Sequence, residues 1–379
     1  MKIYGIICEY NPLHLGHKKQ LDLIKQENGA IVCLMSGNFV QRGQPAIIDK
    51  IARAKAAVDC GADLVLELPV TAALSSAEGF AAGGVNILGK FCDHLSFGAE
   101  NADAEKLMET AHTLLSAEFT EKLRTELDKG LSFPAARQQA LGQDGDILAT
   151  PNNILGVEYC KAIINGGHNM TIAPIQRTGS YHDTLPHPTE PSATAVRQLM
   201  GNGDTWQAFV PEQAVNAFKN ANLHHISYGE RAILSKLRTM TDEEFEKLPF
   251  GSEGLWRKLM HESRRQATLE EILSAVKSKR YTRTRLDRMV MCAYLGITEE
   301  MLQNSAPYVR VLGFNDTGRE ILKKARNSGE FVNIGQETGH EYEALEHRCT
   351  DLYGLFAETL PPAGLEQESR VYYKNTASF

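Results

Sequence analysis

The sequence has 379 residues, of which 42% are hydrophobic and 23% are charged, and its formal net charge is -7. This composition is typical of a globular protein with a sizeable core and excludes wholesale disorder. The negative balance argues against a uniformly basic nucleic-acid binder but leaves room for a local basic face.

Short apolar segments alternate with helix-compatible segments through the first half of the chain. Strands are predicted at residues 2–9, 30–35, 62–67, 94–97 and 171–174, and helices between them at 17–26, 47–60, 72–88 and 104–127. This alternation predicts an α/β, Rossmann-like domain with a parallel sheet, in which ligands bind at the carboxyl ends of the strands. From about residue 206 helical spacing dominates. With a turn-forming junction at 200–205, we expect one domain over 1–203 and a mainly α-helical C-terminal domain over 204–379.

Seven cysteines are scattered along the chain without a CxxC pair. This pattern indicates neither a disulfide framework nor a zinc knuckle. No segment approaches the roughly 18 apolar residues that span a bilayer. We therefore expect a cytoplasmic protein with reduced thiols and no membrane partner.

Two histidines and a glycine follow the first predicted strand, in EYNPLHLGHKKQ. Gly16 has no Cβ, so a nucleotide can approach the backbone closely, and the start of a helix attracts phosphate through its unpaired N–H groups. His14 and His17 are three residues apart, which places both rings on one face of that helix. They are expected to donate hydrogen bonds to the α-phosphate without acting as nucleophiles. An isolated HxGH is as often an incidental surface feature, so the interpretation depends on a partner downstream.

That partner is the segment EPSATAVRQLM. Ser192 stands where an N-cap would stand, Thr194 lies in the first turn and Arg197 follows along the same helix. A second helix start with hydroxyls and a guanidinium suits the β- and γ-phosphates of a triphosphate. Alone, this pattern is an ordinary helix cap. Together, the two segments predict a shared triphosphate site with the catalytic residues His14, His17, Thr194 and Arg197.

The loop SGNFVQRGQPAIIDK follows the second predicted strand and carries Ser36, Gly37 and Gln41. An active-site loop is expected here, since binding residues gather at such strand ends. Lys50 and Arg53 lie three residues apart on the next helix. They are expected to steer a carboxylate or phosphate substrate, with solvated helix charges as an equal alternative.

Residues 251–290 contain ten Lys or Arg and five acids, a local charge of +5. Within KSKRYTRTRLDR, cations surround an aromatic ring, which combines attraction to phosphate with a surface for base stacking. A solvated helical face is the alternative, and we favour RNA contact because the charge is so asymmetric. The predicted contact residues are Lys277, Lys279, Arg280, Tyr281, Arg283, Arg285 and Arg288.

The segments ICEYNPLHLGH, MSGNFVQRGQPAIIDK, ADLVLELP, LSFGAEN and SATAVR resemble the bacterial tRNA(Met) cytidine acetate ligase family, within the HIGH-motif nucleotidylyltransferase superfamily. The resemblance covers nearly all of the first 200 residues and, more loosely, YTRTRLDR and YVRVLGFN. It implies activation of acetate by ATP to acetyl-adenylate, with release of pyrophosphate. The acetyl group would then pass to N4 of the wobble cytidine of elongator tRNA(Met), forming N4-acetylcytidine.

The resemblance also implies an ATP-binding catalytic first domain, a tRNA-binding second domain and Mg²⁺ carried on the ATP phosphates, without a metal site of the protein. Two alternatives stay open: a small-molecule adenylyltransferase of the same superfamily, and a non-catalytic RNA-binding factor that responds to ATP. The oligomeric state stays open as well. The implied ATP-binding residues are Ile7, Cys8, Glu9, Tyr10, Asn11, Pro12, Leu13, His14, Gly16, His17, Gln20, Gly98, Asn152, Arg177 and Ser192.

Overall fold

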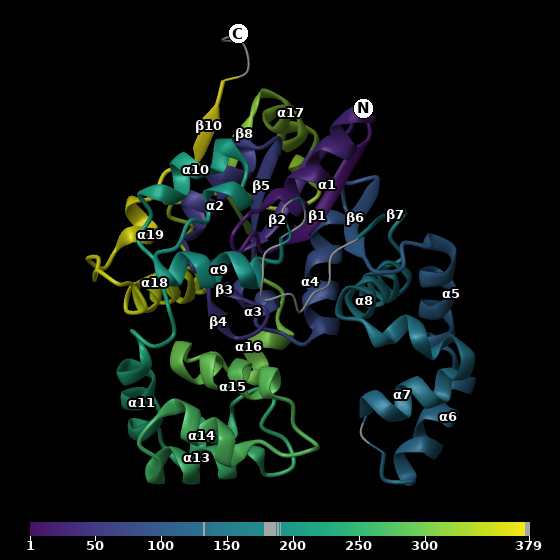
Figure 1. The fold of residues 1–379 in the computed structure, drawn as a ribbon, viewed down its shortest axis with the longest axis vertical. Coiled ribbons are helices and arrows are strands. Elements are labelled where there is room, and N and C mark those ends of the chain that lie inside the picture. Colours follow the sequence, from purple (N-terminus) through teal and green to yellow (C-terminus); the bar gives the residue numbers. More distant parts are fainter. Residues whose placement is uncertain (132, 178–186, 188, 190, 376–379) are drawn as a thin grey trace.

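The computed structural model describes residues 1–131, 133–177, 187, 189 and 191–375, whose strands form one eight-stranded sheet and a two-stranded hairpin (Figure 1). Neighbouring strands of the large sheet are parallel except β5 and β8, so the sheet is mixed but mostly parallel. The hairpin joins β3 (Phe39–Val40) and β4 (Gln44–Pro45). The large sheet has the order β10 (Tyr372–Lys374), β8 (Val309–Asn315), β5 (Leu64–Leu68), β2 (Ala30–Ser36), β1 (Ile3–Cys8), β6 (His94–Ala99) and β7 (Thr171–Gln176), with β9 (Phe331–Asn333) paired to β8.

All five strands predicted from the sequence are present, each within two residues of its predicted bounds. Three predicted helices differ, because polar residues cap new helix starts. The second begins at Lys50, where Asp49 accepts two backbone hydrogen bonds at 2.9 Å. The third predicted helix, at 72–88, is divided into α3 and α4, and Ser76 caps the start of α4. The fourth, at 104–127, is divided into α5 and α6, and Ser116 caps the start of α6.

Alternate side chains of the central strands enter two separate cores, as the two-residue repeat of a strand requires. Ile6 and Cys8 pack with helices α1, α2, α9 and α10, whereas Ile7 packs with α4 and α8 on the opposite face. The helices through α9 are α1 (Leu15–Gln26), α2 (Lys50–Asp59), α3 (Val70–Ala73), α4 (Ala77–Leu88), α5 (Ala104–Leu115), α6 (Ala117–Asp128), α7 (Phe133–Leu141), α8 (Pro151–Gly166) and α9 (Ala193–Asn202), with a 3-10 helix at Gly142–Ala149.

The segment after residue 204 is helical as far as residue 303. From α11 onward its helices build a core of their own, which Phe39 of the hairpin and Leu74 also enter, whereas α10 packs into the core that contains Ile6 and Cys8. In Figure 1 helices α11, α13, α14 and α15 gather below β3 and β4, and α6 and α7 lie to the right of this group. These helices are α10 (Glu212–Lys219), α11 (Glu230–Thr239), α12 (Asp242–Glu246), α13 (Leu255–Arg265), α14 (Leu269–Val276), α15 (Arg283–Leu295) and α16 (Glu299–Gln303), with a 3-10 helix at Gln207–Phe209.

The chain then returns to the sheet. Strand β8 lies antiparallel to β5, and β9 and β10 lie parallel to β8. Three strands from the second half therefore complete the sheet of the first, and the division at 203 and 204 stays a prediction. Within the described ranges, every helix is too short or too polar to cross a bilayer. The remaining helices are α17 (Asp316–Lys324), α18 (Glu341–Gly354) and α19 (Leu365–Glu368), with a 3-10 helix at Ala325–Asn327.

Candidate active site

The first helix start presents two stacked imidazole rings. His14 is the N-cap of α1, and its Nδ1 accepts a hydrogen bond from the backbone N–H of Gly16 at 3.1 Å. The Nδ1 of His17 accepts one from the backbone N–H of His14 at 3.3 Å, and the ring centroids are 3.7 Å apart. Because both Nδ1 atoms accept, each neutral ring carries its proton on Nε2 and can donate it to a ligand.

Both rings are held in the neutral form. Burial, with the charges of His17, Arg177 and Arg197, holds the pKa of His14 well below its usual value. Burial and the charge of Arg177 lower the pKa of His17 to about 3. At neutral pH the pair therefore acts as two hydrogen-bond donors, and the positive charge that acts on it comes from Arg177 and Arg197.

The second helix start lies against the first. Ser192 caps α9 by accepting a hydrogen bond from the backbone N–H of Ala195 at 3.1 Å. Arg197 donates from Nη1 to the carbonyl oxygen of Asn11 at 2.6 Å and from Nη2 to Oγ1 of Thr194 at 3.1 Å. Asn11 precedes the His14 cap by three residues, so the two helix starts are side by side.

A cleft of about 1090 Å³ opens at the carboxyl edge of the sheet and reaches both helix starts. Ligand pockets usually enclose ~300–1,000 Å³, so this one has room for a nucleotide and part of a second substrate. The sequence-predicted residues that line it are Ile7, Cys8, Glu9, Tyr10, Asn11, His14, Gly16, His17, Gln20, Gln41, Gly98, Asn152, Arg177, Ser192, Thr194 and Arg197.

One wall of the cleft is formed by the ends of β6 and β7 and the start of α8. The side chain of Arg177 lies over Gly98, where an added Cβ would come within 3.1 Å of the arginine Cδ. The Nδ2 of Asn152 donates to Glu100 Oε1 at 2.5 Å, which fixes the amide at the cleft wall. A flat backbone at Gly98 with a guanidinium above it suits a ribose or base lying against the sheet.

Of the residues predicted for the nucleotide and the substrate loop, six lie outside this lining: Pro12, Leu13, Ser36, Gly37, Lys50 and Arg53. Leu13 is wholly buried in the core beside α1. Arg53 is also wholly buried, and its guanidinium donates to the carbonyl oxygens of Glu9, Ser36 and Gly37. The steering role expected for Arg53 is corrected by this placement: its donors tie the ends of β1 and β2 together beneath the cleft.

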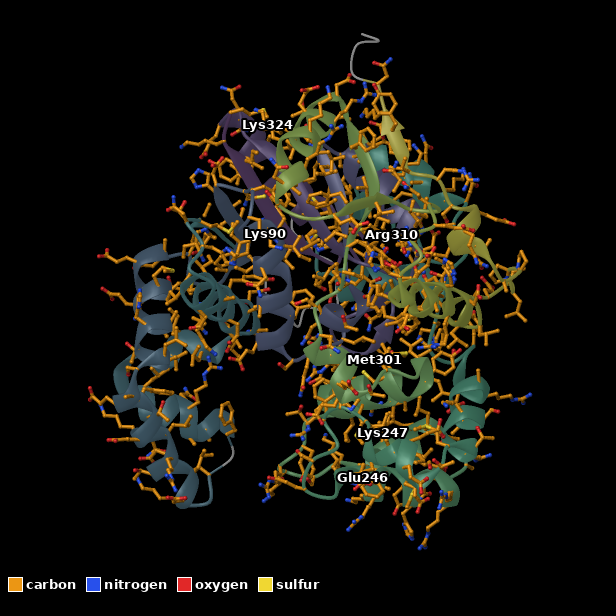
Figure 2. The ribbon with its side chains drawn as sticks, turned by 180° about the vertical axis from the view of Figure 1, so that it is seen from behind. Lys90, Glu246, Lys247, Met301, Arg310 and Lys324 are labelled. Atoms are coloured by element: carbon orange, nitrogen blue, oxygen red, sulfur yellow. The ribbon has the colours of Figure 1, made fainter. Side chains whose placement is uncertain are left out.

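Lys50 belongs to a separate buried cluster. Its Nζ donates to both carboxylate oxygens of Glu67, at 2.9 and 2.8 Å, and to Glu366 Oε1 at 2.8 Å. Arg310 of β8 pairs with Glu346 at 3.0 Å, and these two residues line a cavity of about 20 Å³ together with Lys50 and Glu67. In Figure 2 Arg310 lies above Met301 and Lys247. Since two carboxylates already neutralise the Lys50 ammonium, its expected role in steering a substrate is also corrected.

Comparison with known proteins identifies the family of the chain. The profile of the HIGH nucleotidyl transferase family matches residues 1–368. The chain is similar to the tRNA(Met) cytidine acetate ligase of Clostridium novyi, with 38% identity over 99% of this chain and 100% of the relative. It is similar to the enzyme of the same name in Clostridium acetobutylicum, with 34% identity over 96% of this chain and 97% of the relative. The chain belongs to the tRNA(Met) cytidine acetate ligase family.

Two crystal structures of Thermotoga maritima TmcAL have the same fold as this family member. The apo form has a TM-score of 0.90 at 30% identity, over 99% of this chain and 100% of that one. The form bound with alpha-thio ATP has a TM-score of 0.89 at 29% identity, with the same coverage. A protein with this fold and 29% identity to this chain therefore binds an ATP analogue.

The sequence did not single out several residues that line the cleft of this cytidine acetate ligase family member. Tyr159 lies on α8 seven residues after Asn152, and Phe80 and Phe97 complete an aromatic wall. Seven residues are two helical turns, so this spacing alone could have placed Tyr159 on the face of Asn152. The segment 223–228 also enters the cleft, and its sequence carries no signal of that position.

Internal partners already occupy much of the predicted RNA-binding segment. Arg283 forms two hydrogen bonds with Glu270 and one with Asp287, and Arg285 donates to the carbonyl oxygen of Phe250. Arg288 is only 9% exposed. Lys277, Lys279 and Arg280 are exposed, although Arg280 pairs with Glu253 at 2.5 Å, as does the Tyr281 hydroxyl at 2.9 Å. Of the predicted set, Lys277 and Lys279 are thus the cations best placed to meet an outside phosphate.

Proposed function

We propose that this protein is an ATP-dependent ligase that first makes acetyl-adenylate and pyrophosphate from acetate and ATP. It then transfers the acetyl group to N4 of the wobble cytidine of elongator tRNA(Met). The hydrogen bond from Arg197 to the Asn11 carbonyl carries the proposal, because it brings two anion-binding helix starts to one cleft. The names of the relatives support acetate and tRNA(Met) as the other substrates.

The triphosphate lies between the starts of α1 and α9, with the adenosine toward Gly98 and Arg177. The Nε2–H groups of His14 and His17 donate to the α-phosphate, while Arg197 and the Thr194 hydroxyl hold the departing pyrophosphate. Acetate attacks the α-phosphorus in line with that leaving group. Positioning and charge stabilisation supply the rate enhancement, and no covalent bond to the protein is needed.

Magnesium is proposed to arrive with the nucleotide. Among the described residues no group of three or more His, Cys, Asp or Glu side chains could hold a metal ion. This fits Mg²⁺, which keeps most of its waters and binds chiefly through substrate phosphates. When bound, it would neutralise phosphate charge, and the orientation of the phosphates would stay with the two helix starts.

The tRNA is proposed to contact the helical segment below the cleft through Lys277 and Lys279. Two exposed ammonium groups attract the phosphate backbone without reading its sequence, so they would position the anticodon arm while the cleft selects the base. The reaction uses ATP and tRNA, and we propose that the protein works in the cytoplasm.

Acetate-dependent exchange of labelled pyrophosphate into ATP tests the first step, and nucleoside analysis of total tRNA tests the second. His17→Ala should lower the exchange rate by about 10²–10³-fold, the usual cost of removing one donor to a developing charge. The exposed His112 on α5 supplies a matched control, His112→Ala, which should exchange like the unmodified protein.

An unchanged rate of pyrophosphate exchange in His17→Ala would refute the proposed triphosphate site. Exchange that requires a phosphorylated small molecule instead of acetate would indicate the adenylyltransferase alternative. Binding of tRNA without exchange for any carboxylate would indicate a non-catalytic factor.

A further inference from the structure

The cleft has a second half, on the other face of the sheet from the histidines. Ile7 packs with α4 and α8, whereas Cys8 and Tyr10 pack with α1 and α2. Glu9 follows the last residue of β1, and its carboxylate accepts the backbone N–H of Gln41 in the turn of the hairpin. His14 and His17 stand at the start of α1, on the face opposite to α4 and α8. A phosphate leaving toward α1 and α9 therefore departs away from α4 and α8.

The carboxylate of Glu9 is fixed in place by a hydrogen bond to one of its two oxygens. Its Oε1 accepts the backbone N–H of Gln41 at 2.8 Å, and its carbonyl oxygen accepts a hydrogen bond from Arg53 at 2.6 Å. Its Oε2 has no partner among the described residues, and Glu9 lines the cleft. A fixed carboxylate repels phosphate and attracts a hydrogen-bond donor, so this oxygen suits an amine better than a nucleotide phosphate.

Tyr159 offers the complementary group. It is 2% exposed, and its ring packs against Phe97 with centroids 5.4 Å apart. Its hydroxyl lines the cleft but forms no hydrogen bond within the part of the chain that the structure describes. Burial, with the charges of Cys8 and Glu9, raises the pKa of the phenol well above its usual value, so the hydroxyl stays protonated and can donate. An unpaired hydroxyl of a residue that lines the cleft can donate a hydrogen bond to a ligand bound there.

We propose, resting on the function proposed above, that Glu9 and Tyr159 bind the acceptor cytosine. Glu9 Oε2 accepts a hydrogen bond from the N4 amine, and the Tyr159 hydroxyl donates to the neighbouring N3. Phe80 and Phe97 supply the apolar contact for the base, which must leave its stack to enter such a pocket. A carboxylate facing N4 is the pairing that distinguishes cytosine from uracil, whose O4 would be repelled.

The same contact places a base for the transfer step. The N4 lone pair attacks the carbonyl carbon of acetyl-adenylate and forms the N–C bond. The bond from that carbon to the phosphate oxygen breaks, and its electron pair leaves on AMP. The N4 proton passes to Glu9 Oε2 and then to solvent, so the products are acetylated cytidine, AMP and one proton. Glu9 thus acts as both specificity determinant and general base.

Two half-reactions measured on the full-length protein separate this pocket from the ATP site. Acetate-dependent pyrophosphate exchange, without tRNA, reports acetyl-adenylate formation. Rapid mixing of enzyme preloaded with ATP and acetate against tRNA(Met), followed by mass spectrometry of nucleosides, reports transfer. Glu9→Gln should slow transfer by about 100-fold, the lower range for loss of a general base, and this loss should exceed any loss of exchange by at least tenfold.

The KM for acetate further tests whether Glu9 contacts the cytosine or the acetate. A carboxylate at position 9 repels acetate, so Glu9→Gln should leave this KM equal or lower it. Tyr159→Phe keeps the ring and should slow transfer by about tenfold through loss of one hydrogen bond. Glu78→Gln, on α4 with a side chain 70% exposed, is the matched control and should transfer at the unmodified rate.

If Glu9→Gln lowers the rates of pyrophosphate exchange and acetyl transfer equally, this carboxylate acts on ATP or acetate. That result would overturn the proposed cytosine pocket and leave the proposed function standing. Transfer at the unmodified rate in Tyr159→Phe would overturn the proposed hydrogen bond from the Tyr159 hydroxyl to N3 of the cytosine. An unmodified enzyme without acetate-dependent exchange would overturn the proposed function, and the pocket with it.

Discussion

Replacing Lys50 by methionine removes the ammonium group that holds two buried carboxylates together. Lys50, Glu67 and Glu366 have side chains only 5%, 11% and 1% exposed. Their pairing joins the start of α2 to β5 and to α19, which lies about 300 residues further along the chain. Removing one partner of a buried ion pair typically costs 3–5 kcal/mol because the remaining charge is left without compensation. We expect Lys50→Met to lose about 4 kcal/mol of unfolding free energy at neutral pH.

The loss should depend on pH in a defined direction. Burial raises the pKa of Glu67 above its usual value, and the charge of Lys50 opposes that rise. A carboxyl with a raised pKa stabilises the fold below its unfolded pKa, and this contribution is lost as pH rises through the folded value. Without Lys50 the folded pKa rises further. The variant should therefore be destabilised more at pH 8.5 than at pH 5.5.

Urea unfolding followed by circular dichroism at both pH values measures the effect. Lys55→Met is the matched control, since Lys55 on the same helix pairs with Asp59 at 2.8 Å but is 44% exposed, and it should cost less than about 1 kcal/mol. A cost below 1 kcal/mol for Lys50→Met at both pH values would refute the reasoning. A raised KM for acetate with unchanged stability would restore Lys50 as a substrate-steering residue.

Four further outcomes follow from the site and the residues that support it. In ¹⁵N NMR spectra at pH 6, His14 and His17 should both be neutral with the proton on Nε2; a charged ring or a proton on Nδ1 would contradict the capping geometry. Their lowered pKa values also mean that the unfolding free energy, measured in urea, should fall as pH drops below about 6.5, where the unfolded histidines bind protons first. Gly43→Ala should cost about 2 kcal/mol in the same assay, because φ is 73° and a Cβ would lie 2.4 Å from the α15 backbone; a neutral result would show that the hairpin can shift. Lys277→Glu combined with Lys279→Glu should weaken tRNA binding and flatten its salt dependence, and an unchanged salt slope would move the RNA contact elsewhere.

The sequence predicted the first half of the fold well because its signals are local. Each early strand is a short apolar run, and most helix starts in this part of the chain carry a polar cap such as Asp49 or Ser192. Strand β8 was missed because Arg310 interrupts its apolar run and because it pairs with β5, more than 240 residues earlier. No local pattern encodes such a pairing.

The site divides in a similar way. His14, His17 and Arg197 follow from motifs whose spacing reflects helix geometry, and the structure brings them to one cleft. Lys50 and Arg53 have the same helical spacing but are buried, because carboxylates and carbonyl groups from distant segments meet them. Charge and spacing in a sequence identify what a side chain can do. The partner that it meets depends on the tertiary fold.

The antiparallel contact between β8 and β5 also bears on protein engineering. A fragment ending at residue 203 would keep both helix starts and most of the cleft, yet β5 would lose the neighbour that covers one side of it. Its unpaired N–H and C=O groups, flanked by Leu64, Val65 and Leu66, would form the kind of bare sheet edge that recruits other copies. A minimal soluble version of the nucleotide site should therefore graft residues 309–315 onto that edge.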